Sequence, residues 1–231
     1  MKKYKDLLFD ADNTVFDFSA CEKKSFFASA EKLGIKADAD AYAHYTVYNS
    51  MLWEALERGE IDSNGVLHTR YFKTLEYMGL DTELADVWNA EYESGLADSA
   101  ILYDDSAECL DRLSKKYRLS MITNGIESVQ KSRFKIANLD RYFENRLFIS
   151  GEIGFSKPDR RFFDFVENNL DGFEKSSALV VGDSLTADIA GAVNSEIDAV
   201  FIDRNRKFVY VPEGCVAAFS SFIELLAFLD A

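Results

Sequence analysis

Five short apolar runs, each followed directly by a polar residue or a glycine, constrain the fold of this 231-residue chain more than any other feature. They cover residues 7–9, 119–122, 147–149, 178–181 and 199–202. A strand that is buried on both faces has a continuous apolar sequence, whereas a strand with one solvated face alternates. Stretches with helical spacing lie between or after these runs, at 126–138, 159–170, 186–195 and 219–229. This alternation predicts an α/β fold, a Rossmann-like parallel sheet with helices on both faces.

The segment 18–96 interrupts the alternation. Its pattern is helical almost throughout, over residues 22–33, 39–58, 63–78 and 82–96, and its turns or helix ends are expected at Gly34, Gly59, Gly65 and Gly79. An insert of this length after the first strand is too long for a simple crossover helix. We therefore expect an all-helical cap domain at 18–96, inserted into a core domain of 1–17 and 97–231. Ligands bind at the carboxyl edge of open α/β sheets, so we expect the cap to lie over that edge.

The chain is strongly acidic, with a formal net charge of −14 at pH 7. Such a surface repels the phosphate backbone of long nucleic acids and anionic membranes, so neither is an expected partner. A small anionic substrate is compatible with this charge, because a metal ion and a few cations set the potential inside a pocket.

The sequence contains no segment with the ~18 apolar residues of a membrane span. After the basic start Met1-Lys2-Lys3, the first apolar run ends at Asp10, which is too early for the apolar centre of a signal peptide. Cys21, Cys109 and Cys215 are widely spaced and odd in number, which favours free thiols in a reducing compartment. We therefore expect a cytoplasmic protein, either a monomer or a weak homo-oligomer.

Two carboxylates follow the first predicted strand. Asp10 and Asp12 lie on one side of the chain if the strand stays extended. Carboxylates about 4 Å apart repel each other by roughly 4 kcal/mol at an effective dielectric constant of about 20. This cost indicates a cation or a shared proton between them, although Asp-x-Asp alone is more often a solvated turn.

Two further segments offer groups that bind an anion. Thr123 has a hydroxyl, and Asn124 and Gly125 have backbone N–H groups just before a predicted helix, where anions bind readily. Pro158 keeps Lys157 out of helical geometry, so this lysine lies at a defined bend. Taken separately, the same residues are also typical of a helix cap and of a surface lysine.

Asp183 and Asp188 complete the set. The run 178–181 leads through Gly182 to Asp183 at the same edge of the sheet, and Asp188 follows in the first turns of the next helix. Acidic residues at that point are also ordinary partners of the helix dipole. All four segments lie at the carboxyl ends of predicted strands, and together they combine acids for a metal ion with a cation and a hydroxyl for an anion.

The order Asp-x-Asp, Thr, Lys, Gly-Asp resembles the haloacid dehalogenase superfamily over essentially the whole chain. The matching stretches are 7–14, 122–125, 157–158 and 182–188, and segment 18–96 is similar to the family's first type of cap. Stretches 10–16, 122–125 and 149–158 further resemble a branch of nucleoside monophosphate 5′-nucleotidases that includes pyrimidine-preferring enzymes. Asn13 stands where that branch often has Glu. The resemblance implies a phosphatase that acts on a small phosphate monoester, in particular a nucleotide.

The resemblance also implies a role for each site residue. Asp10 is the nucleophile that forms an aspartyl-phosphate, and Asp12 is the general acid–base. Mg²⁺ is held by the carboxylates of Asp10 and Asp183 and by the backbone carbonyl of Asp12. The phosphoryl group is bound by Thr123, Asn124 and Lys157, and Asp188 orients Lys157 or a metal-bound water.

Other functions stay open at this point. One is a phosphatase of sugar phosphates or other small metabolites. A 2-haloacid dehalogenase is disfavoured by Asp12, because a halide leaves without an acid. A non-catalytic receiver-like phospho-acceptor domain is disfavoured by the length of the chain and by the cap. Aromatic side chains of the cap can stack on a nucleobase, although such residues at helical spacing more often belong to a core. Asn49 and Trp53, four residues apart on one predicted helix face, are the first pair to test for reading a base.

Overall fold

The computed structural model of the chain describes residues 4–230. Residues 1–3 and 231, which the sequence assigns to the core domain, lie outside the described residues. The chain divides into two compact units, which we call the core unit (Met1–Phe18 and Ile101–Ala231) and the helical unit (Ser19–Ala100). Each unit is described by itself.

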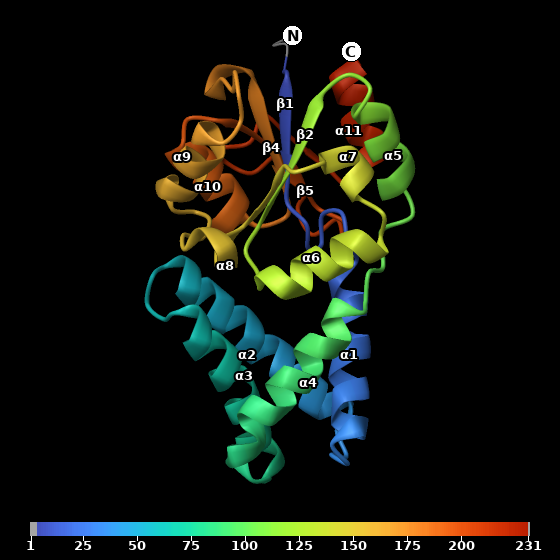
Figure 1. Ribbon diagram of the computed structural model, residues 1–231, viewed down its shortest axis with the longest axis vertical. Coiled ribbons are helices and arrows are strands. Elements are labelled where there is room, and N and C mark those ends of the chain that lie inside the picture. Colours follow the sequence, from blue (N-terminus) through green and yellow to red (C-terminus); the bar gives the residue numbers. More distant parts are fainter. Residues whose placement is uncertain (1–3, 231) are drawn as a thin grey trace. The chain divides into compact units, whose positions relative to one another are not determined.

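The core unit is built on one parallel sheet with β1 near its centre (Figure 1). Its strands are β1 (Asp6–Phe9), β2 (Arg118–Thr123), β3 (Leu147–Ile149), β4 (Ala178–Gly182), β5 (Asp198–Ile202) and β6 (Ala217–Phe219). The order across the sheet is β3-β2-β1-β4-β5-β6, and every neighbouring pair is parallel. The predicted fold class is therefore confirmed.

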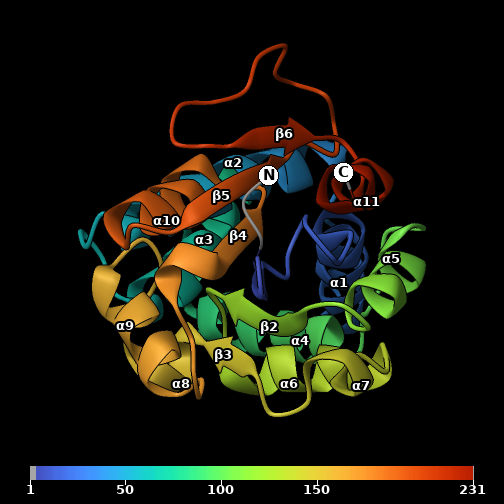
Figure 2. The same cartoon turned by 90° about the horizontal axis from the view of Figure 1, so that it is seen from above.

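Helices cover both faces of this sheet (Figure 2). The helices of the core unit are α5 (Ser106–Leu113), α6 (Glu127–Ile136), α7 (Asp140–Phe143), α8 (Ser150–Ile153), α9 (Arg160–Asn168), α10 (Ala190–Asn194) and α11 (Phe222–Asp230). A π-helical turn, Leu185–Ile189, leads into α10, and a 3₁₀ turn, Lys175–Ser177, precedes β4.

The alternation of side chains along β1 explains why both faces are covered. Leu8 belongs to an apolar cluster with Phe162 and Phe163 of α9. The next residue, Phe9, points to the opposite face, because successive side chains in a strand alternate. Its ring packs against Phe143 of α7 and Phe222 of α11, with centroids 6.4 and 5.4 Å away.

The helical unit has an aromatic core of its own. It contains α1 (Phe18–Lys32) from its second residue on, α2 (Ala39–Glu57), α3 (Ser63–Met78) and α4 (Ala85–Ala97), with a 3₁₀ turn at Thr82–Leu84. The rings of Phe26, Tyr45, Tyr71 and Trp88 are buried and contact one another. The side chains of Asp38 and Asp62 cap α2 and α3 by accepting backbone N–H groups.

Asn49, one of the two residues singled out to test for reading a base, lies in a buried polar network of the helical unit. Its amide donates to Glu22 at 2.8 Å, and its carbonyl oxygen accepts from Arg70 at 3.5 Å. Both ends of this amide are therefore used within the unit.

Some expected elements were wrong or missing. Residue 219, expected in the last helix, ends strand β6. Helix α5 and strand β6 had no expected counterpart. The helix expected at 186–195 is a π-helical turn followed by the short α10.

The three cysteines are free, as predicted. In the part of the chain from residue 4 to residue 230, no helix is long and apolar enough to cross a bilayer.

Candidate active site

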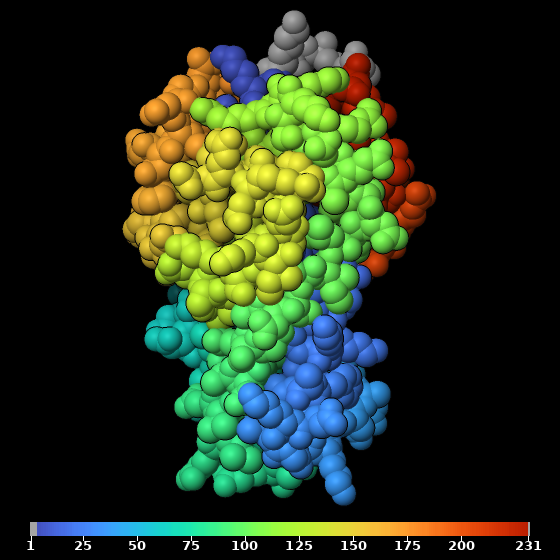
Figure 3. Space-filling model, turned by 45° about the vertical axis from the view of Figure 1, so that its right-hand side comes forward, coloured from blue at the N-terminus to red at the C-terminus, as the bar shows by residue number. Residues whose placement is uncertain are grey.

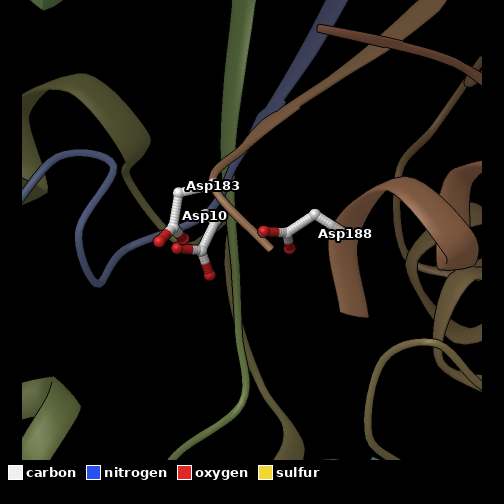
Figure 4. A group of neighbouring side chains, drawn as sticks. All are labelled: Asp10, Asp183 and Asp188. Atoms are coloured by element: carbon white, nitrogen blue, oxygen red, sulfur yellow. The ribbon is translucent and has the colours of Figure 1, made fainter. Parts of the chain in front are cut away.

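The site begins where the two central strands end. Phe9 at the end of β1 is in register with Val181 of β4, and the Asp10 N–H donates to the Val181 carbonyl at 2.8 Å. Asp10 and Asp183 therefore leave the same edge of the sheet side by side. Asp188 approaches them from the π-helical turn before α10 (Figure 4). One carboxylate oxygen from each of these three residues lies within 4.8 Å of the others.

Lys157 joins two of these carboxylates. Its ammonium group donates to Asp10 Oδ1 at 2.7 Å, to Asp188 Oδ1 at 2.6 Å and to the Ile122 carbonyl at 2.8 Å. An ammonium group has three donors, so this lysine is fully hydrogen-bonded. Only 1% of Lys157 is exposed, so these hydrogen-bond partners, and not solvent, stabilise the ammonium charge.

Asn124 fixes the loop that carries Lys157. The Asn124 side chain donates to the Lys157 carbonyl at 2.8 Å and accepts the Lys157 N–H at 2.9 Å. This pair of bonds ties the end of β2 to the segment before α9. The Asn124 side chain thus positions the lysine, a contact that the sequence did not predict.

Burial dominates the electrostatics of the cluster. Desolvation raises the pKa of Asp10 to about 7, with the nearby charge of Lys157 opposing this change and the charges of Asp188 and Asp12 adding to it. Burial, followed by repulsion from Asp10 and Asp188, also raises the pKa of Asp183 well above its ordinary value. Burial alone would lower the pKa of Lys157, but the charges of Asp10 and Asp188 outweigh it and raise the pKa, so the ammonium stays protonated.

The carboxylates form a donor set that suits Mg²⁺. This ion prefers oxygen ligands and needs only one or two carboxylates from the protein. Three acids at this distance repel one another in a buried site, and a divalent cation removes that repulsion. The residues present therefore fit the metal that the sequence predicted.

Asp12 lies in a separate network with α6. Its Oδ2 accepts from the Gln130 amide at 2.7 Å, and its Oδ1 accepts from Arg133 at 2.6 Å. Gln130 also donates to the Thr123 hydroxyl at 2.9 Å. Gln130 and Arg133 were not among the predicted site residues, although they follow Thr123 by seven and ten positions on the helix after the second motif.

Two glycines make room for this arrangement. A Cβ on Gly182 would lie well inside 3.0 Å of the Asp188 carboxylate, so only glycine lets Asp188 come this close to the end of β4. A Cβ on Gly125 would come within 2.9 Å of the Gln130 amide nitrogen. The Gly125 N–H donates to Ser150 Oγ at 3.1 Å, so this backbone group, expected in an anion cradle, is already paired.

The predicted residues thus fall into connected groups. Asp10, Asp183, Asp188 and Lys157 meet directly, Asp12 and Thr123 are joined through Gln130, and Asn124 holds Lys157 in place. Their individual roles stay predictions.

The chain is similar to known proteins over most of its length. The model of the haloacid dehalogenase-like hydrolases matches residues 4–195. The chain is 31% identical to YfnB of Bacillus subtilis, named as a HAD-hydrolase, over 90% of this chain and 87% of YfnB. A magnesium-bound crystal structure of YfnB superposes with a TM-score of 0.93 at 29% identity and covers 100% of both chains.

Two relatives are named as nucleotidases. The pyrimidine 5′-nucleotidase PynA of Streptococcus pneumoniae is 34% identical, over 86% of this chain and 83% of PynA. The pyrimidine 5′-nucleotidase YjjG of Escherichia coli is 24% identical, over 92% of this chain and 91% of YjjG.

The chain belongs to the haloacid dehalogenase-like hydrolase family. The predicted family is confirmed, and so is the predicted class of enzyme, a phosphoric monoester hydrolase.

Proposed function

We propose that the chain is a Mg²⁺-dependent 5′-nucleotidase that prefers pyrimidine nucleoside monophosphates and works through an aspartyl-phosphate. The observation that carries this proposal is the buried carboxylate of Asp10, which shares Lys157 with Asp188 and lies within reach of Asp183. The similarity to PynA and YjjG supports the choice of a pyrimidine nucleotide.

Asp10 performs the attack in this mechanism. Lys157 binds its Oδ1, so we assign the attack to Oδ2. A bond forms between Oδ2 and phosphorus while the bond from phosphorus to the ester oxygen breaks. Asp12 gives a proton to that leaving oxygen, and the product alcohol departs. Asp12 then takes a proton from water, which attacks phosphorus and releases inorganic phosphate and the free Asp10 carboxylate.

Mg²⁺ would be held by the carboxylates of Asp10 and Asp183 and by the Asp12 carbonyl, with Asp188 as a neighbouring acid. When bound, Mg²⁺ neutralises charge on the phosphoryl oxygens and lowers the repulsion between them and Asp10.

The neighbouring residues hold the phosphoryl group. The Thr123 hydroxyl accepts a hydrogen bond from Gln130, which leaves its own proton to donate to a phosphoryl oxygen. The Asn124 backbone N–H adds a second donor, and Lys157 balances the negative charge that develops in transfer.

A panel of phosphate esters, assayed with Mg²⁺ and with excess chelator, tests the proposal. We expect Mg²⁺-dependent phosphate release, with a higher kcat/KM for UMP and CMP than for purine nucleotides and sugar phosphates. Equal or better turnover of sugar phosphates would replace the nucleotide assignment with the broader phosphatase.

The Asp10→Asn variant is the mechanistic arm of that test. We expect it to lose turnover completely, because an amide oxygen does not form the acyl phosphate. Asp98→Asn, which changes an exposed aspartate of the helical unit, serves as the matched control and keeps full activity. An aspartyl-phosphate that persists in the wild type without turnover would instead indicate a phospho-acceptor domain.

A further inference from the structure

One buried face of α6 carries two polar side chains, and the proposed reaction so far uses only the hydrogen bond from Gln130 to Thr123. Gln130 and Arg133 are one turn apart on this helix and are 2% and 0% exposed. The stretch containing α6 and α7, yellow-green to yellow in Figure 3, forms much of the visible surface of the core unit, whereas these two side chains are buried. Charged and amide groups are buried so completely only when they have partners.

The hydrogen bonds fix how the Gln130 amide is oriented. Its nitrogen faces Asp12 Oδ2 and the Thr123 hydroxyl, while its oxygen accepts from Arg133 at 3.0 Å. A flipped amide would place oxygen against a carboxylate and NH₂ against a guanidinium, and both contacts would be repulsive. The network therefore has a single consistent arrangement.

Arg133 binds the other oxygen of Asp12 and also packs against two aromatic rings. Its guanidinium donates to Asp12 Oδ1 and lies 4.3 Å from the centroid of the Phe16 ring and 5.6 Å from that of Phe18. Cation–π contacts of this kind restrict a guanidinium that is already paired. Both oxygens of Asp12 therefore have a donor from α6, and each retains a lone pair for a proton.

We infer that Gln130 and Arg133 are positioning residues that aim the Asp12 carboxyl at the leaving oxygen. This inference rests on the proposed function, in which Asp12 protonates the leaving group. It assigns the two residues no contact with the substrate. Gln130 also links Asp12 to Thr123, so the proton donor and a phosphoryl-binding hydroxyl are set by one side chain.

A misplaced Asp12 and a partly unfolded enzyme differ in their effect on two substrates. A nucleoside 5′-phosphate expels an alkoxide and needs the proton from Asp12, whereas p-nitrophenyl phosphate expels a stabilised phenolate that needs none. The ratio of kcat/KM for the two substrates therefore reports on proton donation by Asp12, because a shift of the phosphoryl-binding Thr123 lowers both values alike and cancels. The fraction of folded enzyme cancels in this ratio, so a variant that is partly unfolded still gives a clear answer.

The experiment measures this ratio for Gln130→Met in the full-length chain with Mg²⁺. We expect the ratio of kcat/KM for UMP to that for p-nitrophenyl phosphate to fall ~10- to 100-fold, part of the ~10²- to 10⁴-fold that general acid catalysis supplies. Arg133→Met should change the ratio in the same direction, and Arg133→Lys should restore part of it. Lys131→Met removes an exposed charge from the same helix and should leave the ratio unchanged.

A double variant shows whether Gln130 acts through Asp12. Asp12→Asn should change the ratio most, and adding Gln130→Met to it should change the ratio no further, because residues that act as one unit are not additive. Equal losses on both substrates in Gln130→Met, or an additive double variant, would overturn the inference. Phosphate release by the wild type, and its dependence on Asp10, would survive that result, so the two proposals fail separately.

Discussion

Gly182 is the residue on which the geometry of the carboxylate cluster depends most directly. Its φ lies outside the left-handed region, so the backbone there would accept any residue. The constraint is space, since a Cβ would meet the Asp188 side chain that holds Lys157. One methyl group at this position would therefore disturb the orientation of the lysine.

We predict that Gly182→Ala lowers kcat/KM by roughly 100-fold, the scale expected when catalytic groups are misplaced by about 1 Å. Steady-state kinetics with circular dichroism as the folding control would measure this. The matched test adds the substitution to Asp188→Ala. In the Asp188→Ala background the obstructing side chain is absent, so Gly182→Ala should lower kcat/KM little further. A large further loss in that background would show that the glycine is needed for another reason.

The raised pKa values of Asp10 and Asp183 make the stability of the metal-free chain depend on pH. Each folded carboxyl binds its proton more tightly than the unfolded one, so its contribution to stability is complete below about pH 4 and declines as pH rises toward the folded pKa, about 7 for Asp10. Bound Mg²⁺ takes the place of those protons and reverses the loss.

We therefore predict that the stabilisation by saturating Mg²⁺ increases between about pH 5 and pH 7, by about 1.4 kcal/mol per pH unit for each proton displaced. Thermal unfolding with and without Mg²⁺ at each pH measures this stabilisation. The pH-dependent contributions of groups away from the metal are the same in both measurements and cancel in the difference. Asp183→Asn should remove most of the effect. A Mg²⁺ effect of constant size over this range would contradict the prediction.

At the level of single residues, the sequence predicted the groups that follow strands and missed those inside a helix. Asp10, Lys157 and Asp183 each stand just beyond an apolar run or before a proline, so their position on the sheet edge follows from the local pattern. Arg133 lies between the exposed Lys131 and Lys135 on α6, and nothing in the local sequence distinguishes a buried cation from its solvated neighbours. Its burial follows from the position of Asp12, which is set by another element.

The ends of the helices in the helical unit depend on particular glycines. Gly79 ends α3 in the left-handed conformation, with φ of 66°, and the space around its hydrogen is open. Gly95 lies inside α4, where an added Cβ would make ordinary contact with Ser25 at 3.6 Å. Both positions have room for a Cβ, so the backbone conformation decides what alanine does at each.

We predict opposite effects from the same change at these positions. Gly79→Ala should destabilise the helical unit by about 1 kcal/mol, because alanine is strained in the left-handed region. Gly95→Ala should stabilise it by about 0.5–1 kcal/mol, through helix propensity and lower entropy of the unfolded chain. Urea unfolding of the two variants beside the wild type measures both values, and effects of the same sign would contradict the assignment.

Elements were predictable where local signals agreed with the fold. Gly79 and Gly65 both mark ends of α3, because Gly79 follows its last residue and Gly65 lies in its first turn, where the absent Cβ leaves room for Ile61. Strand β6 was missed because its three residues are only half-buried, at the edge of the sheet, so they lack the continuous apolar run of a central strand. Such cases are decided by tertiary neighbours, which lie far away in the sequence.

At the scale of the whole molecule, the chain consists of two units with separate cores. The core unit has the sheet and the carboxylate cluster, while the helical unit has its own buried aromatic rings. The sequence predicted an inserted helical segment because its helical spacing continues without a strand. Its placement over the sheet edge stays a prediction.

The two tryptophans of the chain, Trp53 and Trp88, both lie in the helical unit, so tryptophan fluorescence reports the unfolding of that unit alone. The proposed ligands of Mg²⁺ all lie in the core unit. We predict that Mg²⁺ at about 100 times its Kd stabilises the core unit by about 2.7 kcal/mol and leaves the fluorescence-detected transition unchanged.

Urea titrations followed by fluorescence and by hydrogen exchange of peptides from β1 and β4 would separate the two transitions, with Asp183→Asn as the control that removes the shift. If Mg²⁺ shifted both transitions together, the two units would unfold as one cooperative structure. An ion bound in the core unit stabilises the helical unit, where the tryptophans lie, only if the unfolding of the two units is coupled.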